Sequence, residues 1–205
     1  VSHGSYVAKF DTLGNVKSLV QVLSGFQDVE LRDFEIDEFD NKYVTGSYQD
    51  TVIISGIQFV SNGVANTFII KYDNQMNPIW WKTTYGIIYE QADGIVVNDN
   101  GDVYITGVMS CDAMFVLGDT LWPYKDCQFN GVNTPFLAKY NSNGNFVWVR
   151  YGDVKARSFG HDVELNPQNQ NPIISGRFSE SLKFDNISFT SNYYHEPFFV
   201  EFDSF

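Results

Sequence analysis

The sequence predicts an all-β protein built from repeated four-stranded units, and three observations lead to this prediction. The chain is rich in aromatic residues, with 18 Phe, 12 Tyr and 4 Trp among 205 residues. These residues stand with Val, Ile and Thr in short runs separated by Asn, Asp and Gly, a pattern typical of strands and tight turns. One motif of strand, turn and strand also recurs along the chain, so we expect equivalent structural units.

The clearest copy of this motif is FLAKYNSNGNFVWVR, at residues 136–150. Phe136, Ala138 and Tyr140 alternate with other residue types, which indicates a pleated strand. The Asn, Ser and Gly residues that follow predict a turn, and the aromatic and β-branched residues after them predict the returning strand. The other copies are YVAKFDTLGN (6–15), FIIKYDNQMN (68–77) and the shortened FFVEFD (198–203).

A second landmark is a short strand that ends in Thr-Gly or Ser-Gly. It occurs at residues 43–46 (YVTG), 104–107 (YITG) and 173–176 (IISG). Another short strand precedes each copy, at residues 34–37, 95–98 and 163–166. One unit is therefore strand, turn, strand, a variable hairpin and the two strands of the first motif.

The unit repeats at nearly constant spacing. Lys9, Lys71, Lys139 and Glu201 hold the same place in the motif, at offsets of 62, 68 and 62 residues. Four-stranded units of this length predict the blades of a β-propeller. A β-sandwich is the main alternative, although sandwich strands have no need to repeat in sequence.

We expect one β-propeller segment across residues 1–205. Its parts would be a partial blade at 1–20, blades at 31–83 and 92–151, and a partial blade at 160–205. A closed propeller normally has at least about four blades. We therefore expect an arc of a longer protein, with a ring completed by a partner as the alternative.

The motifs FLAKYNSNGNFVW and NGDVYITG resemble the bacterial β-propeller repeat (the SBBP-like repeat) of large secreted or surface proteins, notably in bacteria with type IX secretion. The resemblance extends over residues 6–203, and it departs at Ser18, Met76, Glu201 and in the segment that holds the two cysteines. It implies export, an extracellular or cell-surface location and a role in adhesion or assembly. The family has no shared catalytic residues to transfer.

The net charge of −12 would repel the phosphate backbone of a nucleic acid and an anionic membrane. No apolar run approaches the ~20 residues that a membrane-spanning helix needs. Cys111 and Cys127 lie within one insertion and lack a CxxC spacing, which favours a disulfide over a metal site. Two free thiols in a reducing compartment are the alternative.

Several residues are candidates for binding. Arg32, Asp93 and His161 hold equivalent positions at the entrance to the first strand of a blade, where they would form a charged rim around the central opening. Aromatic side chains in the hairpin regions could bind a sugar or a protein, with packing at the outer edge as the alternative. These are Trp122, Tyr124, Tyr193 and Tyr194.

Catalytic and metal motifs are missing from the sequence. The turn at residues 98–102 (NDNGD) has oxygen ligands at alternate positions, but it lacks the length and the later Glu of a calcium loop. Carboxylates that could form a glycosidase pair include Glu35, Asp37, Asp40 and Glu164. We predict no enzyme activity, no catalytic residue, no cofactor and no metal.

An Asp-Thr pair followed by an apolar residue resembles the O-glycosylation acceptor of the same bacteria, at Thr12, Thr51 and Thr120. The sequence thus predicts a non-catalytic, exported β-propeller module for binding or assembly at a bacterial cell surface. Its partner would be a protein or a surface glycan, in a larger secreted or surface assembly, and not a nucleic acid. The alternative is a propeller-type glycoside hydrolase or lectin.

Overall fold

The structure is a computed structural model that describes residues 3–26, 28–61, 63–86, 89–110, 114–117, 120–123 and 133–203. Every regular element in these ranges is a β-strand. The described residues hold no helix that is long and apolar enough to cross a membrane.

Two four-stranded antiparallel sheets form the middle of the molecule, and we call them the first and second blade. The first blade consists of β3 (Val29–Ile36), β4 (Lys42–Tyr48), β7 (Asn66–Tyr72) and β8 (Pro78–Thr83), in that order. The second consists of β9 (Glu90–Val97), β10 (Val103–Met109), β13 (Thr134–Tyr140) and β14 (Phe146–Tyr151). The landmark strands ending in Gly are therefore β4 and β10, the second strands of their blades.

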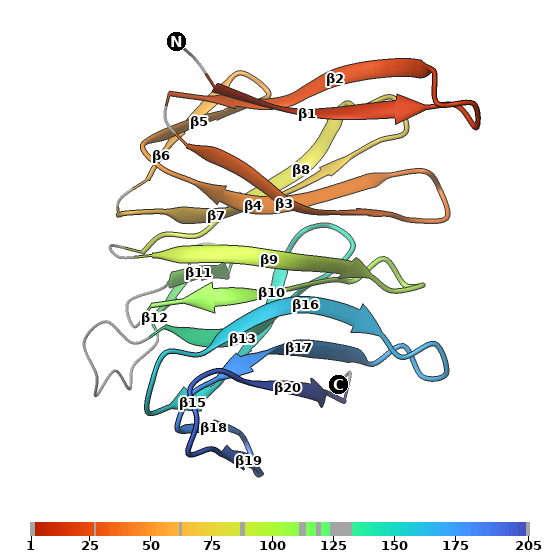
Figure 1. The fold of residues 1–205 in the computed structure, drawn as a ribbon. Coiled ribbons are helices and arrows are strands. Elements are labelled where there is room, and N and C mark those ends of the chain that lie inside the picture. The colour runs from red at the N-terminus through yellow and green to blue at the C-terminus, as the bar shows by residue number, and fades with distance from the viewer. Residues whose placement is uncertain are drawn as a thin grey trace.

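A partial sheet lies beyond each blade. The N-terminal sheet contains β1 (His3–Phe10) and β2 (Val16–Gly25), and the C-terminal sheet contains β16 (Phe159–Leu165), β17 (Pro172–Phe178) and β20 (Glu196–Glu201). Figure 1 shows the sheets stacked in chain order, with the N-terminal strands at one end and the C-terminal strands at the other. The predicted class is confirmed: the fold is all-β and β-propeller-like, built from repeated four-stranded antiparallel sheets.

The variable hairpin between the second and third strands is present in each unit. The hairpins are β5 (Thr51–Ile54) with β6 (Ile57–Val60), β11 (Met114–Leu117) with β12 (Thr120–Pro123), and β18 (Ser181–Phe184) with β19 (Ile187–Thr190). The first hairpin pairs back onto β2, and the third pairs onto β15 (Asp153–Val154), which follows β14. Each of these two hairpins thus ties its unit to the preceding one by backbone hydrogen bonds.

Three apolar clusters fill the spaces between neighbouring sheets. One joins the N-terminal sheet to the first blade, the second joins the two blades, and the third joins the second blade to the C-terminal sheet. The aromatic residues of the repeated motif lie at these interfaces: Phe68 and Tyr72, Phe136 and Tyr140, and Phe198 and Phe202. The motif therefore repeats because these three copies each pack against an adjacent sheet.

The Trp of the fourth strand links the blades more specifically. Trp80 donates a hydrogen bond from Nε1 to the carbonyl oxygen of Ser142 at 3.1 Å. Its ring covers Gly144 so closely that a Cβ added there would lie 2.6 Å from the ring. Gly144 also has φ of 76°, which favours glycine. Met76 holds the same turn position in the first blade with φ of 67°, and there the preceding sheet has Ser18 in place of Trp.

Candidate functional site

The first strand of each blade-like sheet contains a β-bulge at the same position. In β3 the pairing register with β4 shifts between Leu31 and Asp33, so Arg32 opposes no residue of β4. The same shift leaves Asp93 without an opposing residue in β10, and His161 without one in β17. The sequence prediction placed these three residues at the entrance to the strand, and this is wrong: they lie within it, because β3, β9 and β16 begin earlier than expected.

The bulges explain the Gly that ends each landmark strand. A Cβ on that Gly would lie about 2 Å from a backbone carbonyl oxygen of the bulged strand. The distances are 1.9 Å from Gly46 to Glu30, 2.1 Å from Gly107 to Gln91, and 2.0 Å from Gly176 to Phe159. Every side chain larger than hydrogen would collide with the bulge, so the Thr-Gly and Ser-Gly motifs are the sequence counterpart of the bulge.

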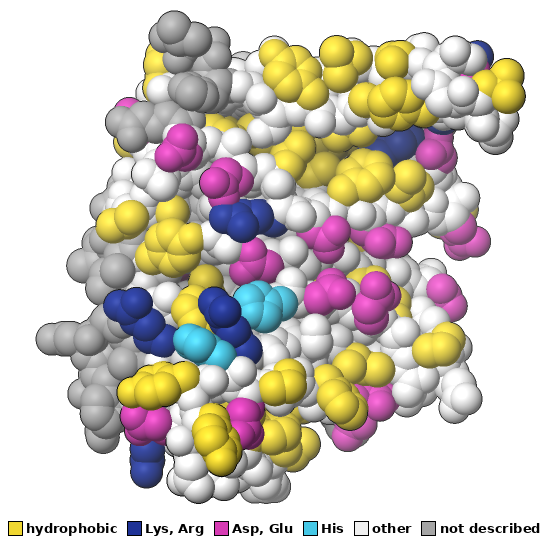
Figure 2. Space-filling model, viewed as in Figure 1, with side chains coloured by type: hydrophobic (Ala, Val, Ile, Leu, Met, Phe, Trp, Pro, Cys, Tyr) yellow, Lys and Arg dark blue, Asp and Glu magenta, His cyan; other side chains and the backbone are white. Residues whose placement is uncertain are grey.

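We call Arg32, Asp93 and His161 the bulge row. Their strands β3, β9 and β16 lie next to one another, at the inner edge of each sheet. Figure 2 shows basic, acidic and His side chains gathered over these strands. Asp33 helps to hold the strands together, since its Oδ2 accepts a hydrogen bond from the backbone N–H of Ile95 at 2.8 Å. The row is therefore displayed by ordered strands and not by loops.

Gln91 lies at the centre of a polar network in the row. Its side-chain oxygen accepts hydrogen bonds from Arg32 Nη2, at 3.1 Å, and from the hydroxyl of Tyr89. Its Nε2 donates to Asp93 Oδ1, and Arg32 Nη1 lies 3.8 Å from the same oxygen. Arg32 also forms an ion pair with Glu30. The network fixes the direction of both charged side chains, which favours a preformed binding surface.

An aromatic and cationic platform forms the other end of the row. The rings of Phe159 and His161 are nearly parallel, with an interplanar angle of 5° and centroids 6.3 Å apart. The guanidinium carbon of Arg177 lies 4.6 Å from the Phe159 ring centroid, a cation–π contact. Along the row, a positive charge on Arg32 is followed by a negative charge on Asp93 and then by the platform, which includes the positive charge of Arg177.

The surroundings shift the pKa of two members of the row. Burial raises the pKa of the Asp93 carboxyl, and this effect outweighs the opposing hydrogen bond from Gln91 and the charges of Arg32 and His161. Partial burial lowers the pKa of the His161 imidazole, and the Arg177 charge lowers it further. Asp93 is therefore a poorly hydrated carboxylate, and it gains from a cationic or hydrogen-bonding ligand.

The carboxylates that could form a glycosidase pair have different surroundings. Asp37 accepts hydrogen bonds from Asn41 and from the Tyr43 hydroxyl, and Asp40 lies 2.9 Å from Lys42 Nζ. Both are thus used within their turn. Burial raises the pKa of the Glu35 carboxyl, and the negative charges of Asp33 and Glu164 add to the effect.

The turn at residues 98–102 uses its oxygen atoms for its own backbone. Asn98 Oδ1 accepts the N–H groups of Asn100 and Asp102, at 3.0 and 2.9 Å. Asp102 pairs with Lys139 Nζ at 2.8 Å. An ordinary hairpin turn therefore accounts for the pattern that resembles a calcium loop. The described residues contain no group of three or more His, Cys, Asp or Glu side chains that could hold a metal ion.

The other predicted site residues lie away from the bulge row. Tyr193 and Tyr194 are 74% and 84% exposed in the connection between β19 and β20, beside a shallow pocket of about 270 Å³. Trp122 belongs to β12, and its side chain lies outside the described residues. Tyr124, Cys111 and Cys127 lie outside them as well, so the disulfide stays a prediction.

The three predicted glycosylation sites differ in accessibility. Thr12 is exposed in the turn between β1 and β2. Thr51 is only 5% exposed, and its hydroxyl donates to Asp50 Oδ1 at 3.0 Å. A glycosyltransferase therefore cannot reach the Thr51 hydroxyl in the folded chain. Thr120 is the first residue of β12, and its side chain is outside the described residues.

The comparison with known proteins gives one significant relative. The chain is 26% identical over 160 residues to the uncharacterized WD repeat-containing protein L264 of Acanthamoeba polyphaga mimivirus. The alignment covers 71% of this chain and 11% of the relative. No protein-family model matches the sequence. The relative agrees with a β-propeller-type repeat, and it comes from a virus, so it gives no support to the bacterial secretion that the resemblance implied.

Proposed function

We propose that the chain is a non-catalytic segment of a β-propeller that binds a protein partner through the bulge row. One observation carries the proposal: the bulge places Arg32, Asp93 and His161 at equivalent positions on adjacent strands, and these positions differ in charge while their surroundings repeat. Bulges are frequent next to binding sites because they redirect a side chain out of the ladder. The WD repeat in the name of the viral relative is consistent with a propeller used for protein interactions.

The chemistry of the row favours an extended peptide with both charges. Arg32 suits a carboxylate, Asp93 suits a Lys or Arg, and the stacked rings of Phe159 and His161 suit an aromatic or cationic side chain. Arg32 and Asp93 are already oriented by Gln91, so little side-chain entropy is lost on binding.

A random-peptide phage library panned on the purified chain tests the proposal. Peptides recovered on the wild type would be measured by calorimetry against Arg32→Ala and His161→Ala. Each variant should weaken binding by about 10-fold or more, as expected for central contacts. Lys17→Ala is the matched control, since Lys17 is an exposed base on β2, away from the bulge row, and should leave affinity unchanged.

Two binding results would contradict the proposal. One is a set of peptides whose affinity is the same for the wild type and both row variants. The other is selective binding on a glycan array with no peptide recovered, which would favour the lectin alternative. Turnover of a polysaccharide would favour the glycoside hydrolase, and Glu35 and Glu164 would then be the first residues to replace.

Export to a cell surface is a separate proposal, and it rests on the resemblance to secreted repeats alone. An oxidising compartment would join Cys111 to Cys127. The intact mass of protein taken from its native source should then rise by about two hydrogens on reduction, and an unchanged mass argues against export.

A further inference from the structure

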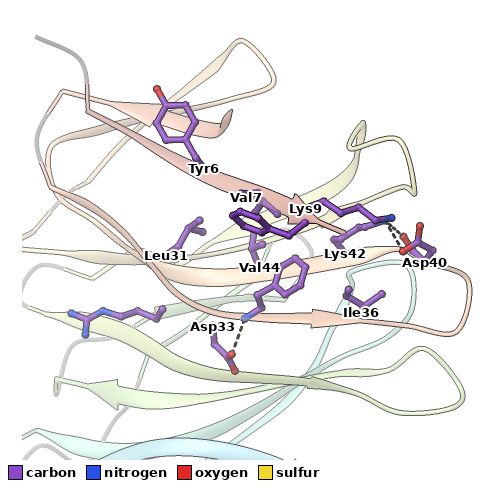
Figure 3. A pocket seen from close by; sticks show the side chains of 13 residues that line it. Tyr6, Val7, Lys9, Leu31, Asp33, Ile36, Asp40, Lys42 and Val44 are labelled. Atoms are coloured by element: carbon purple, nitrogen blue, oxygen red, sulfur yellow. Dashed lines mark hydrogen bonds and ion pairs between the residues drawn. The ribbon is translucent and has the colours of Figure 1, made fainter. Parts of the chain in front are cut away.

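A groove of about 590 Å³ runs along β1, between this strand and the first blade. Figure 3 shows Val7 of β1 and Val44 of β4 directed into the same space, with the ion pair between Lys42 and Asp40 at one end. β1 stands at the margin of its sheet and pairs with β2 alone among the described strands. The groove thus has an apolar floor and one strand edge available for pairing.

The groove exposes residues of β1 whose equivalents are buried elsewhere. At the first and fifth positions of the repeated motif, the two blades bury their aromatic side chains almost completely: Phe68 is 0%, Tyr72 3%, Phe136 1% and Tyr140 3% exposed. Tyr6 and Phe10 hold these positions in β1 and are 55% and 57% exposed. Tyr6 and Phe10 are therefore aromatic residues of the kind that the blades bury, but in β1 they are exposed to solvent.

The opposite wall of the groove shows the same contrast. Phe34 of β3 is 39% exposed, whereas Ile95 of β9 and Val163 of β16, at the equivalent position, are each 2% exposed. Ile95 and Val163 pack against the preceding blade. Phe34 faces the N-terminal sheet, which has no strand in the place of β3 or β4 in the described residues. In the described part of the chain, this place thus lacks two strands of a complete four-stranded unit.

The complete blades indicate which sequence fits beside β1. Lys71 of β7 pairs with Tyr43, and Lys139 of β13 pairs with Tyr104. The Lys Nζ lies over the Tyr ring in both, 4.9 and 5.4 Å from its centroid. Lys9 is the equivalent Lys of β1, so a Tyr belongs opposite it.

The Thr-Gly landmark supplies the rest of the register. Gly46 pairs with Phe68, and Gly107 pairs with Phe136. The adjacent Thr hydroxyl donates to the carbonyl oxygen of the same Phe, at 2.8 Å in the first blade and 2.7 Å in the second. Tyr6 is the residue of β1 that corresponds to these Phe residues, so the Gly belongs opposite Tyr6.

We propose that the groove is a β-strand acceptor for the first two strands of one further unit of the same polypeptide. The second strand of that unit carries Tyr-x-Thr/Ser-Gly and runs antiparallel to β1, with its Tyr opposite Lys9 and its Gly opposite Tyr6. The first strand covers Phe34. The viral relative, of which the chain spans 11%, has ample length for such units. The groove shares Arg32 with the bulge row but neither Asp93 nor His161, and the inference does not rest on peptide binding by the row.

The first test uses the chain as it is, labelled with ¹⁵N, and a synthetic peptide of residues 90–109, which form β9 and β10. The amide signals of β1 and of Arg32 should shift on addition of the peptide, and those of Asp93 and His161, which do not line the groove, should stay in place. The control peptide carries Gly107→Val, which prevents its bulge. Tyr6→Asp in the chain should abolish the shifts, whereas Leu19→Asp, at a 64% exposed position on β2, should preserve them.

An isolated hairpin peptide is only marginally stable in water. A second test therefore joins the two added strands covalently to the chain. A copy of residues 29–65 is joined directly before Gly4, the residue that corresponds to Asn66. The urea midpoint of the fusion should rise and the amides of β1 should become protected, and Gly46→Val in the added copy should remove both effects. The proposal would be overturned if the peptide shifted no β1 amide and the fusion showed neither a higher urea midpoint nor protected β1 amides. Dimerisation of the unmodified chain through β1 would also overturn it, because the occupant of the groove would then be a second copy of the chain.

Discussion

Substitution of the landmark Gly by Ala gives the sharpest test of the link between the repeat and the bulge. In Gly107→Ala the new Cβ would lie 2.1 Å from the carbonyl oxygen of Gln91 and 2.8 Å from Ala92 Cα. These are backbone atoms of β9, so no side-chain rotation can relieve the collision. The strand that carries Asp93 must therefore move by about 1 Å to restore an ordinary contact distance.

The magnitude follows from a comparison with a second glycine. Overpacking of a dense interior costs about 1–3 kcal/mol, and displacement of a paired backbone puts Gly107→Ala at the top of this range, about 3 kcal/mol. Gly14, in the turn between β1 and β2, has φ of 82° and no heavy atom within 4 Å of an added Cβ. Gly14→Ala adds left-handed strain without a collision and should cost about 1 kcal/mol.

Urea unfolding followed by circular dichroism would measure both free energies of unfolding. Thermal unfolding of the same variants would measure their melting temperatures. For a chain of this size, we expect these temperatures to fall by about 6–12 °C for Gly107→Ala and by about 2–4 °C for Gly14→Ala. Gly107→Ala should also shift the NMR signals of the bulge row, because the bulge itself moves. An equal loss of stability in the two variants, or an unmoved bulge row in Gly107→Ala, would refute the reasoning.

Two further predictions concern the charge of the row and the contact between sheets. The His161 imidazole should titrate below its ordinary pKa of about 6.5, lower still in Asp93→Asn and higher in Arg177→Gln, as followed by NMR of its ring signals. The pKa of His161 is lower in the folded than in the unfolded chain. The stability that His161 contributes is therefore present above pH ~6.5 and is lost as the pH falls through the folded pKa. A titration midpoint of the His161 ring above ~6.5 would contradict the predicted direction of the shift. Tyr72→Phe removes a hydroxyl that donates to the Val22 carbonyl oxygen at 2.6 Å and should cost about 1–2 kcal/mol in urea unfolding. Tyr193→Phe, at a 74% exposed position, is its control, and equal stability of the two variants would remove the role given to the bond.

The sequence predicts the strands of this fold well because its repeats encode packing. Phe136 and Tyr140 have aromatic equivalents in β7 and β20 that also meet an adjacent sheet, and Gly107 has equivalents in Gly46 and Gly176 that also meet a bulge. Both requirements recur at fixed positions of the repeated unit. A single sequence is therefore enough to align them.

The pairing of hairpins with the preceding unit was not predicted. Ser24 and Gly25 of β2 pair with Ile53 and Val52 of β5, and no pattern in either segment identifies the other. Backbone hydrogen bonds make this contact, so it places little demand on residue type. Such pairing depends on how the sheets stack, which a sequence pattern does not encode.

The position of the bulge could have been found from a break in alternation. The apolar residues Val29 and Leu31 are two positions apart, as are Phe34 and Ile36, but three positions separate Leu31 from Phe34. The extra residue is Arg32, and the slip in period marks it as the bulge. The alternation that follows the slip begins only at Phe34, and for this reason it predicts a strand that excludes Arg32.

The bulge also explains why the residue type at the bulged position varies within a repeat that is otherwise regular. A residue paired in the ladder must suit its cross-strand neighbour and the adjacent sheet, which constrains its type. Arg32, Asp93 and His161 oppose no residue of the second strand, so this constraint is absent for their side chains. The Gly opposite the bulge preserves the backbone whatever the bulged residue is. The unit can thus change the charge it displays on its first strand without a loss of fold, which agrees with the partner binding that we propose for the bulge row.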